Sequence, residues 1–432
     1  MKKQKRIRVT RKNKDGESIM SQPDERLIPK VNVGLMGHVD HGKSTLAQAI
    51  SGKWADTHSE EIKRGITIRL GYADATIYRC NECDGPSCYC TTDKCPTCFG
   101  DTEPIRTISL VDVPGHKTLM GTVLSGAALM DGCILVINAD EPCPQPQTAE
   151  HLKTLDIVGI ENIIIVQNKI DKVSEERARE SYDEIKSFVK GTVAEDAPII
   201  PISALQRINV DAVLQAIEEE IKAKDMDPDA TPRMMVARSF DTNRPGSPIK
   251  NMKGGVIGGS LLQGELEVGD EIEVRPGVER DGKRSPIRTE VTGLEKVGQS
   301  LEKAGPGGLL GVQTRLDPSL TKSDNLAGCV VGYPGELPDM LDKIVVEVHT
   351  FDEVAGVVDS RKVDRIKTNE PLMLTVGTAK TAGIVTSARI KDGEEEAEIS
   401  LKLPICSDKG ERVAISRQIE NKWRLIGYGI IK

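Results

Sequence analysis

Short apolar runs alternate with helical stretches through the first half of the chain. The apolar runs cover residues 31–36, 107–111, 132–139 and 163–167, and the first helical stretch covers residues 44–50. Buried strands that alternate with helices predict a parallel sheet with crossover connections.

The pattern changes after one more helix and a linker. Residues 209–222 carry apolar side chains on one helical face, and residues 225–232 (DMDPDATP) have the composition of a linker. Beyond it, short β-rich runs punctuated by glycine, such as residues 253–264 and 268–277, favour antiparallel barrels. A second break at residues 333–339 (YPGELPD) predicts that there are two of them.

The chain therefore divides into four predicted segments. A basic flexible N-terminal arm covers residues 1–29, an α/β domain residues 30–226, and two β-barrel domains residues 233–338 and 339–432. The arm has eight Lys or Arg among its first 19 residues, which suits either a solubilising tail or a polyanion-binding segment, and Met20 is an alternative start.

Charge and composition exclude several classes of function. The net charge of −8 argues against a generally basic surface for nucleic acid, and twelve aromatic residues are too few for base-stacking platforms. No apolar run approaches the eighteen or so residues that span a bilayer. We expect a cytoplasmic protein with no membrane contact.

A phosphate-binding loop is the first chemical signal. Residues 37–44 (GHVDHGKS) match G-x-x-x-x-G-K-[ST] between a predicted strand and a predicted helix. Gly37 and Gly42 let backbone N–H groups close around phosphate oxygens, Lys43 neutralises the β and γ phosphates, and the Ser44 hydroxyl is a ligand for Mg²⁺. The loop predicts a bound nucleoside triphosphate.

Two later segments indicate that the base is guanine. Residues 168–171 (NKID) follow a predicted strand, and the Asp171 carboxylate accepts from both the ring N–H and the amine of guanine. Adenine offers no such pair, so this site rejects it. Residues 203–205 (SAL) follow another apolar run and supply the second base contact.

Two further segments predict a GTP-dependent switch. In DVPGH, Asp112 holds Mg²⁺ through water, the Gly115 N–H meets the γ-phosphate, and His116 orients the attacking water. In RGITIR, Thr67 binds Mg²⁺ and the γ-phosphate only while that phosphate is present. Loss of the phosphate therefore frees that segment.

A cysteine-rich insertion at about residues 78–102 predicts a structural zinc knuckle. Two C-x-x-C pairs complete a tetrahedral shell with no open position, and the four ligands are Cys80, Cys83, Cys95 and Cys98. Cys88 or Cys90 could replace one ligand, and reactive or redox cysteines are the competing interpretation. The fold class is thus an α/β P-loop GTPase domain with a zinc-knuckle insertion, followed by two β-barrel domains.

Together these motifs resemble those of the translational GTPases. GHVDHGKST and DVPGHKTLM are typical of factors similar to elongation factor Tu. Within that group the chain resembles the γ subunits of archaeal and eukaryotic translation initiation factor 2 over about residues 30–432. The features that carry this are residues 57–75, the cysteine insertion, EPCPQPQTAEHL and PGELPDMLDKIVVEV.

The resemblance implies partners and a cycle. The partners are the α and β subunits of the same factor, methionylated initiator tRNA and the small ribosomal subunit; GTP hydrolysis releases the tRNA after start-codon selection. It also implies slow intrinsic hydrolysis, with Val39 and Ile66 as an apolar gate over His116.

The resemblance further assigns residues to the binding of GTP or GDP, to the binding of Mg²⁺ and to catalysis. The nucleotide residues are Val39, Asp40, His41, Gly42, Lys43, Ser44, Thr45, Asn168, Lys169, Asp171, Ser203, Ala204 and Leu205; the Mg²⁺ residues are Ser44, Thr67, Asp112 and Asp40; the catalytic residues are His116, Thr67, Gly115 and Asp40.

Two rival functions share some of these features. A selenocysteine-specific elongation factor has a similar nucleotide domain but normally carries an added C-terminal RNA-binding region. A metabolic P-loop enzyme would have no use for RGITI, His116 or the barrels. The isolated cysteines at 133, 143, 329 and 406 are expected to be buried, and His58, His151 and His349 receive no catalytic role.

Overall fold

The computed structural model describes most of the chain. The described residues are 10–12, 18–20, 24–53, 70–116, 119–224, 226–244, 246, 248, 250, 252–280, 283–354, 362–391 and 393–432. The predictions for His58, Ile66 and Thr67 lie outside the described residues.

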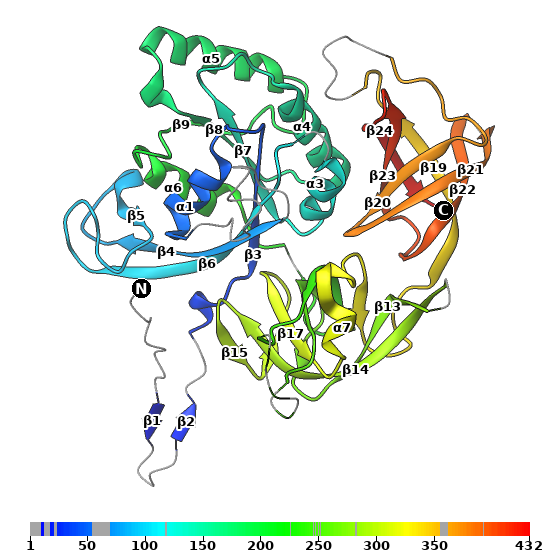
Figure 1. The fold of residues 1–432 in the computed structure, drawn as a ribbon. Coiled ribbons are helices and arrows are strands. Elements are labelled where there is room, and N and C mark those ends of the chain that lie inside the picture. Colours follow the sequence, from blue (N-terminus) through cyan, green and yellow to red (C-terminus); the bar gives the residue numbers. More distant parts are fainter. Residues whose placement is uncertain are drawn as a thin grey trace.

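Domain I is an α/β domain around one seven-stranded sheet (Figure 1). The strand order is β5-β4-β6-β3-β7-β8-β9, and the strands from β6 to β9 run parallel, as predicted. The strands are β3 (Val31–Met36), β4 (Gly71–Cys80), β5 (Tyr89–Cys90), β6 (Thr102–Asp112), β7 (Gly132–Asn138), β8 (Ile163–Asn168) and β9 (Ile199–Pro201).

Helices cover both faces of this sheet. They are α1 (Lys43–Ser51), α3 (Met120–Ala127), α4 (Pro146–Val158), α5 (Glu175–Val189) and α6 (Val210–Glu220), the last being the predicted closing helix. One apolar core lies under α1 and α6, and a second under α3, α4 and α5. Strands β3, β7 and β8 are buried at every position because they have a core on each side.

Domain II is a closed barrel. The ring runs β13-β18-β10-β11-β17-β14 and closes through pairing of β13 with β14, while β15 extends β14. Its strands are β10 (Arg233–Phe240), β11 (Val256–Gln263), β13 (Glu271–Arg280), β14 (Lys283–Lys296), β15 (Gln299–Leu301), β17 (Leu310–Thr314) and β18 (Val330–Gly332). Outside the ring lie β12 (Leu266–Glu267), β16 (Lys303–Ala304) and α7 (Pro318–Thr321).

Domain III is a second closed barrel, in the order β19-β22-β21-β20-β23-β24. Its strands are β19 (Met340–Thr350), β20 (Pro371–Val376), β21 (Ala379–Lys391), β22 (Glu394–Cys406), β23 (Arg412–Ile419) and β24 (Lys422–Ile431). The predicted fold class of an α/β domain followed by two barrels is confirmed. Closure leaves neither barrel with a long unpaired edge.

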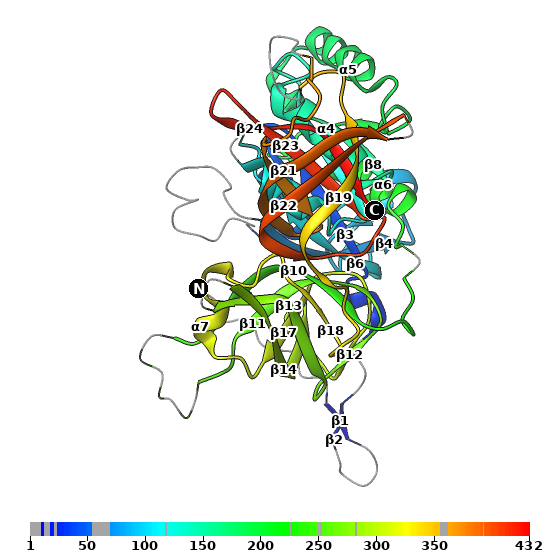
Figure 2. The same ribbon diagram turned by 90° about the vertical axis from the view of Figure 1, so that its right-hand side faces the viewer.

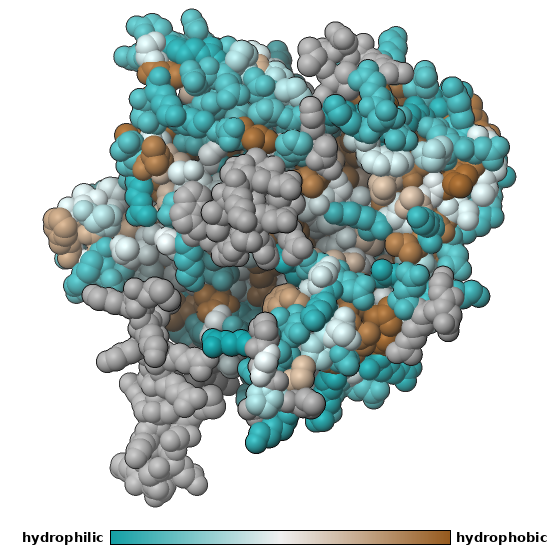
Figure 3. All heavy atoms as spheres, in the orientation of Figure 1, coloured by the Kyte–Doolittle hydropathy of each residue, from teal (hydrophilic) through white to brown (hydrophobic). Residues whose placement is uncertain are grey.

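The three domains pack around a common junction (Figures 1 and 2). Helices α3 and α4 of domain I face strands of domain III, while domain II lies below the domain I sheet in Figure 1 and contacts it through a hydrogen bond from Asn32 to Ser260. Figure 3 shows that the outer face in this view is mostly hydrophilic, with hydrophobic residues in small scattered groups. The apolar side chains are therefore concentrated in the separate domain cores.

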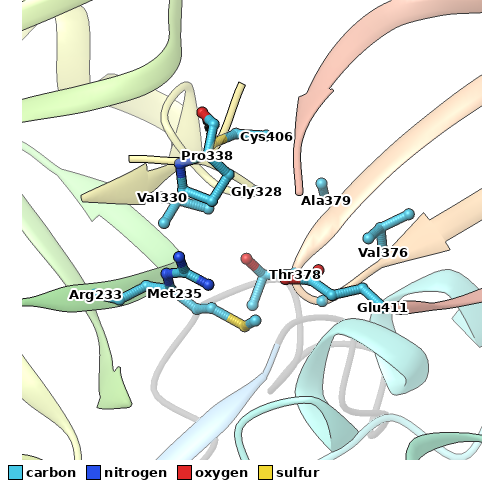
Figure 4. Close-up of a pocket in the computed structure, with 11 residues that line it drawn as sticks. Arg233, Met235, Gly328, Val330, Pro338, Val376, Thr378, Ala379, Cys406 and Glu411 are labelled. Carbon is cyan, nitrogen blue, oxygen red and sulfur yellow. Dashed lines mark hydrogen bonds between the residues drawn. The ribbon is translucent and has the colours of Figure 1, made fainter. Parts of the chain in front are cut away.

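The two barrels meet at a small pocket (Figure 4). Arg233 and Met235 of domain II face Thr378 and Glu411 of domain III across it. Arg233 also forms an ion pair with Asp408. These contacts fix the barrels to each other beside α3.

The end of the predicted N-terminal arm belongs to the folded body. Residues 24–29 include the 3₁₀ turn η1 (Glu25–Leu27), and Ile28 packs against the domain II core. The Thr107 hydroxyl of domain I donates to the carbonyl of Arg26 at 3.0 Å. Residues 24–29, called the strap below, therefore connect domain I to domain II. Pro29 of the same segment is also buried.

The four isolated cysteines largely behave as predicted. Cys133, Cys329 and Cys406 are buried, and Cys143 is half-buried. Burial raises the pKa of the Cys406 thiol to about 12, so it stays protonated at neutral pH.

The strap predicts that glycine is required at residue 307. A Cβ at Gly307 would lie 2.3 Å from the Lys30 carbonyl oxygen, whereas Gly298 has a similar positive φ and nothing within 4 Å. Gly307→Ala is expected to lower the free energy of unfolding by about 2 kcal/mol more than Gly298→Ala, measured by urea unfolding. Equal losses would show that backbone strain alone matters and that the strap contact does not.

Candidate nucleotide site

The phosphate-binding loop joins the end of β3 to the start of α1. Gly37 has φ +140° and Gly42 has φ +95°, conformations that L side chains rarely adopt. A Cβ at Gly37 would lie 2.2 Å from the Val136 carbonyl oxygen, and one at Gly42 would lie 2.3 Å from Asn168 Nδ2. The loop is thus closed tightly onto β7 and β8, and only glycine fits at either position.

His41 anchors the loop to the sheet. Its Nδ1 lies 3.0 Å from the Val136 carbonyl oxygen, and Asn168 Nδ2 donates to the His41 carbonyl at 2.8 Å. Burial lowers the pKa of His41 to about 4, so the ring is neutral at pH 7 and donates from Nδ1. Its Nε2 lies 3.5 Å from the Glu141 carboxylate.

His151 supports the same loop from helix α4. The Gly37 N–H donates to His151 Nδ1 at 2.8 Å. Burial holds the pKa of His151 well below its ordinary value, so Nδ1 remains an acceptor at neutral pH. His151 received no catalytic role from the sequence, and its contact with Gly37 is structural.

Three of the predicted phosphate and Mg²⁺ residues lie together at the carboxyl edge of the sheet: Lys43, Ser44 and Asp112. Lys43 Nζ donates to the carbonyls of Gly37 at 3.0 Å and His38 at 2.7 Å. The Ser44 hydroxyl donates to the Asp112 carboxylate at 2.6 Å. The N-terminus of α1 directs backbone N–H groups to the same place, which suits an anion.

The DVPGH segment lies directly over the loop. A Cβ at Gly115 would lie 2.7 Å from Lys43 Nζ and 2.8 Å from the Val39 nitrogen. His116 follows and is half-buried, as is Val39. Asp40 is exposed with φ 61°, and Thr45 is half-buried in the first turn of α1.

The two base-recognition segments are joined by one side chain. Asn168 Oδ1 accepts from the Ala204 N–H at 3.0 Å while its amide nitrogen holds the phosphate loop. Ser203 is buried, and its hydroxyl accepts from the Gln206 N–H at 3.2 Å. The remaining predicted base residues are open to solvent to different degrees: Lys169 is half-buried, and Asp171 and Leu205 are exposed.

Four thiols of the insertion converge. The Sγ atoms of Cys80, Cys83, Cys95 and Cys98 lie within 4.8 Å of one another. Backbone N–H groups of Cys98 and Thr97 lower the pKa of the Cys95 thiol to about 6, whereas the interaction with Cys98 raises the pKa of the Cys83 thiol, so Cys95 loses its proton before Cys83 does. Cys88 packs against the group, and the Cys90 thiol instead donates to the Thr92 carbonyl at 3.3 Å.

Family models match all three domains. Residues 29–223 match the Elongation factor Tu GTP binding domain, residues 254–332 match Elongation factor Tu domain 2, and residues 342–431 match Initiation factor eIF2 gamma, C terminal. The fold and site therefore define a translational GTPase, an enzyme that hydrolyses GTP.

Curated relatives narrow this class. Translation initiation factor 2 subunit gamma of Methanothermobacter thermautotrophicus is 57% identical over 407 residues, 93% of this chain and 99% of that protein. The protein of that name from Methanocaldococcus jannaschii is 56% identical over 417 residues, 96% of this chain and 100% of that protein. The chain belongs to this family of γ subunits and is a GTP-dependent subunit of a translation initiation factor.

Solved structures share the fold at low identity. The bacterial selenocysteine-specific elongation factor EF-Sec has a TM-score of 0.71 at 22% identity, covering 94% of this chain and 58% of that chain. Elongation factor SelB from Methanococcus maripaludis with a GTP analogue has a TM-score of 0.70, also at 22% identity, covering 94% of this chain and 79% of that chain. The selenocysteine-factor alternative is thus only a distant structural neighbour. Among the described residues, no helix is long and apolar enough to cross a membrane.

The double role of Asn168 predicts a large effect on nucleotide affinity. Asn168→Ala removes the bonds to the His41 carbonyl and the Ala204 N–H, and it leaves both groups buried without a partner. We expect GDP to bind about 10- to 100-fold more weakly in a fluorescence titration. Asn162→Ala is the control, because Asn162 donates only to the Asp131 carbonyl near the start of β8. Equal weakening by both changes would contradict the assigned role.

Proposed function

We propose that this chain is the GTP-gated carrier of methionylated initiator tRNA within a heterotrimer of α, β and γ subunits. In the GTP state it delivers that tRNA to the small ribosomal subunit, and hydrolysis ends the interaction. The supporting observation is near-full-length similarity, at 57% identity, to initiation factor γ subunits, combined with an intact phosphate loop.

The site binds the nucleotide at its phosphates and at its base. Gly42, Lys43, Ser44 and Thr45 surround the phosphates with backbone N–H groups and one ammonium group, and Val39, Asp40 and His41 complete the loop. The base lies between Asn168, Lys169 and Asp171 on one side and Ser203, Ala204 and Leu205 on the other. Exposure of Asp171 leaves its carboxylate accessible to guanine.

The oxygen donors of the site fit Mg²⁺. Ser44 Oγ and the Asp112 carboxylate are already 2.6 Å apart, and hard oxygen donors are what this ion prefers. Asp40 and Thr67 are the further ligands that we propose. When bound, Mg²⁺ neutralises charge on the β and γ phosphates.

Hydrolysis depends on residues next to the phosphate loop. We assign His116 the role of orienting the attacking water, and we assign the Gly115 N–H, Thr67 and Asp40 to the γ-phosphate region. The closeness of Gly115 to Lys43 and Val39 means that a γ-phosphate between them must press on the DVPGH segment. This contact makes GTP a conformational signal and not only a substrate.

The cysteine cluster fits Zn²⁺. Four sulfur donors within 4.8 Å of one another satisfy a tetrahedral shell, which leaves no position for substrate. The site is therefore structural, and it holds the insertion against α6.

Removal of one proposed ligand tests the zinc site. The purified protein is expected to hold about one Zn²⁺ per chain by elemental analysis. Cys98→Ser should hold less than about half of that amount, because three thiolates bind Zn²⁺ less tightly than four. Cys90→Ser should keep the full amount because Cys90 bonds to Thr92 instead. A full zinc content in Cys98→Ser would show that a different set of ligands is used.

Selective retention of initiator tRNA tests the proposed function. With a matched α subunit and a GTP analogue at fixed salt, methionylated initiator tRNA should bind at least about tenfold more tightly than methionylated elongator tRNA. Replacing the analogue with GDP should weaken that binding, because the γ-phosphate contacts are lost. Equal binding of both tRNAs, or none in either nucleotide state, would refute the carrier function while leaving the GTPase intact.

A further inference from the structure

Helix α4 touches the phosphate loop on one side and domain III on the other. His151 accepts the hydrogen bond from the Gly37 N–H at 2.8 Å. The preceding residue, Glu150, accepts a hydrogen bond from Arg424 of β24 at 2.7 Å. Figure 1 shows α4 between the domain I sheet and strands β23 and β24. A single helical turn thus connects the nucleotide site to a different domain.

The ion pair that joins α4 to domain III is buried. Glu150 has no exposed surface, and the Arg424 side chain is only 13% exposed. Burial raises the pKa of the Glu150 carboxyl, and the hydrogen bond from Arg424 opposes that shift. Removal of one partner of such a pair leaves an uncompensated buried charge, which is far costlier than removing both partners. The position of Glu150 therefore depends on Arg424.

Other contacts between α4 and domain III follow further along the helix, where Lys153 donates to the Glu353 carbonyl at 3.2 Å. Arg412 donates to the carbonyls of Asp156 and Ile157, both at 3.0 Å. Ile157 packs there with Leu425 in a small apolar cluster. This end holds the domains together, and its contacts begin at Asp156, more than one helical turn after the residue that reaches Gly37.

We propose that His151 is a positioning residue for the phosphate-binding loop, and that Arg424 of domain III acts on it through Glu150 to set the rate of nucleotide release. The inference rests on the proposed nucleotide site and adds its regulation. A partner that shifts domain III would thereby change how long GDP or GTP stays bound.

The physical steps follow from the stiffness of the helix. If Arg424 moves away, the Glu150 carboxylate loses its counter-charge, and it can stay ionised only by moving toward water. The backbone of α4 moves with it, and His151 leaves the Gly37 N–H. Gly37 then loses the acceptor that fixes its strained φ, and the loop holds phosphate less firmly.

The experiment measures release of a fluorescent GDP analogue from the full chain in stopped flow, with the melting temperature of each variant. Two single changes test the acceptor on α4: His151→Ala removes it, and His151→Asn keeps an oxygen near the Nδ1 position. Arg424→Met breaks the ion pair, whereas Glu150→Gln with Arg424→Met removes both charges. Arg412→Met is the matched control at the other end of α4.

We expect His151→Ala and Arg424→Met each to release the analogue about tenfold faster than the unmodified chain. His151→Asn and the charge-free double variant should each remain within about threefold of it. Arg412→Met should release the analogue at the original rate even if its melting temperature falls. Combining His151→Ala with Arg424→Met should be no faster than either change alone, because both act through one bond.

Three results would overturn the proposal. They are an unchanged release rate in Arg424→Met, equal acceleration by Arg412→Met, and additive acceleration when His151→Ala and Arg424→Met are combined. Failure of the unmodified chain to bind guanine nucleotide would instead refute the proposed nucleotide site. The two failures are therefore distinguishable.

Discussion

The structure depends on keeping the phosphate-binding loop, residues 37–44, in a conformation whose backbone N–H groups can reach phosphate at the edge of the parallel sheet. Such a loop has strained glycines and many N–H groups aimed at one point, so it collapses unless other groups fix it. Three groups do so here: the Val136 carbonyl, the Asn168 side chain and His151 of α4. Each comes from a different element, so the loop is only as rigid as the packing of β7, β8 and α4.

Because the phosphate loop needs support from neighbouring elements, the nucleotide site is connected to the other two domains. Two elements next to the loop also contact the other domains: α4 contacts domain III, and β3, which leads into the loop, contacts domain II through a hydrogen bond from Asn32 Nδ2 to Ser260 Oγ at 3.0 Å. The DVPGH segment lies over the loop, and α3, which follows it in sequence, reaches domain III through Ser125, whose hydroxyl donates to the Thr378 carbonyl at 3.1 Å. Short chains of contacts therefore connect the phosphate loop to both barrels.

The sequence predicted the features whose determinants are local. The spacing of residues along the chain identifies loop glycines, strand-end motifs and paired cysteines. The predicted fold class is therefore correct, and the four predicted thiols lie together. The contacts of Gly37 with His151 and of Glu150 with Arg424 join residues 114 and 274 positions apart, and no spacing rule reports them. Residues 24–29 were assigned to the arm because the apolar pattern begins only at residue 31, whereas Ile28 packs against the domain II core.

The buried ion pair Glu150–Arg424 is not needed if the interface between domains I and III only has to be stable. Apolar side chains of the same volume are often as stable or more so, because two charges need not be desolvated. The interface uses both kinds of contact: an apolar cluster at the C-terminal end of α4, and the Glu150–Arg424 pair beside the turn that supports the phosphate loop. An apolar contact tolerates small shifts, whereas a buried charge pair favours one geometry sharply. The Glu150–Arg424 pair, which depends strongly on geometry, lies next to the residue that supports the phosphate loop. At this place the state of the nucleotide and the position of domain III are coupled in our proposal. A contact that is either formed or broken suits such a switch better than one that changes gradually.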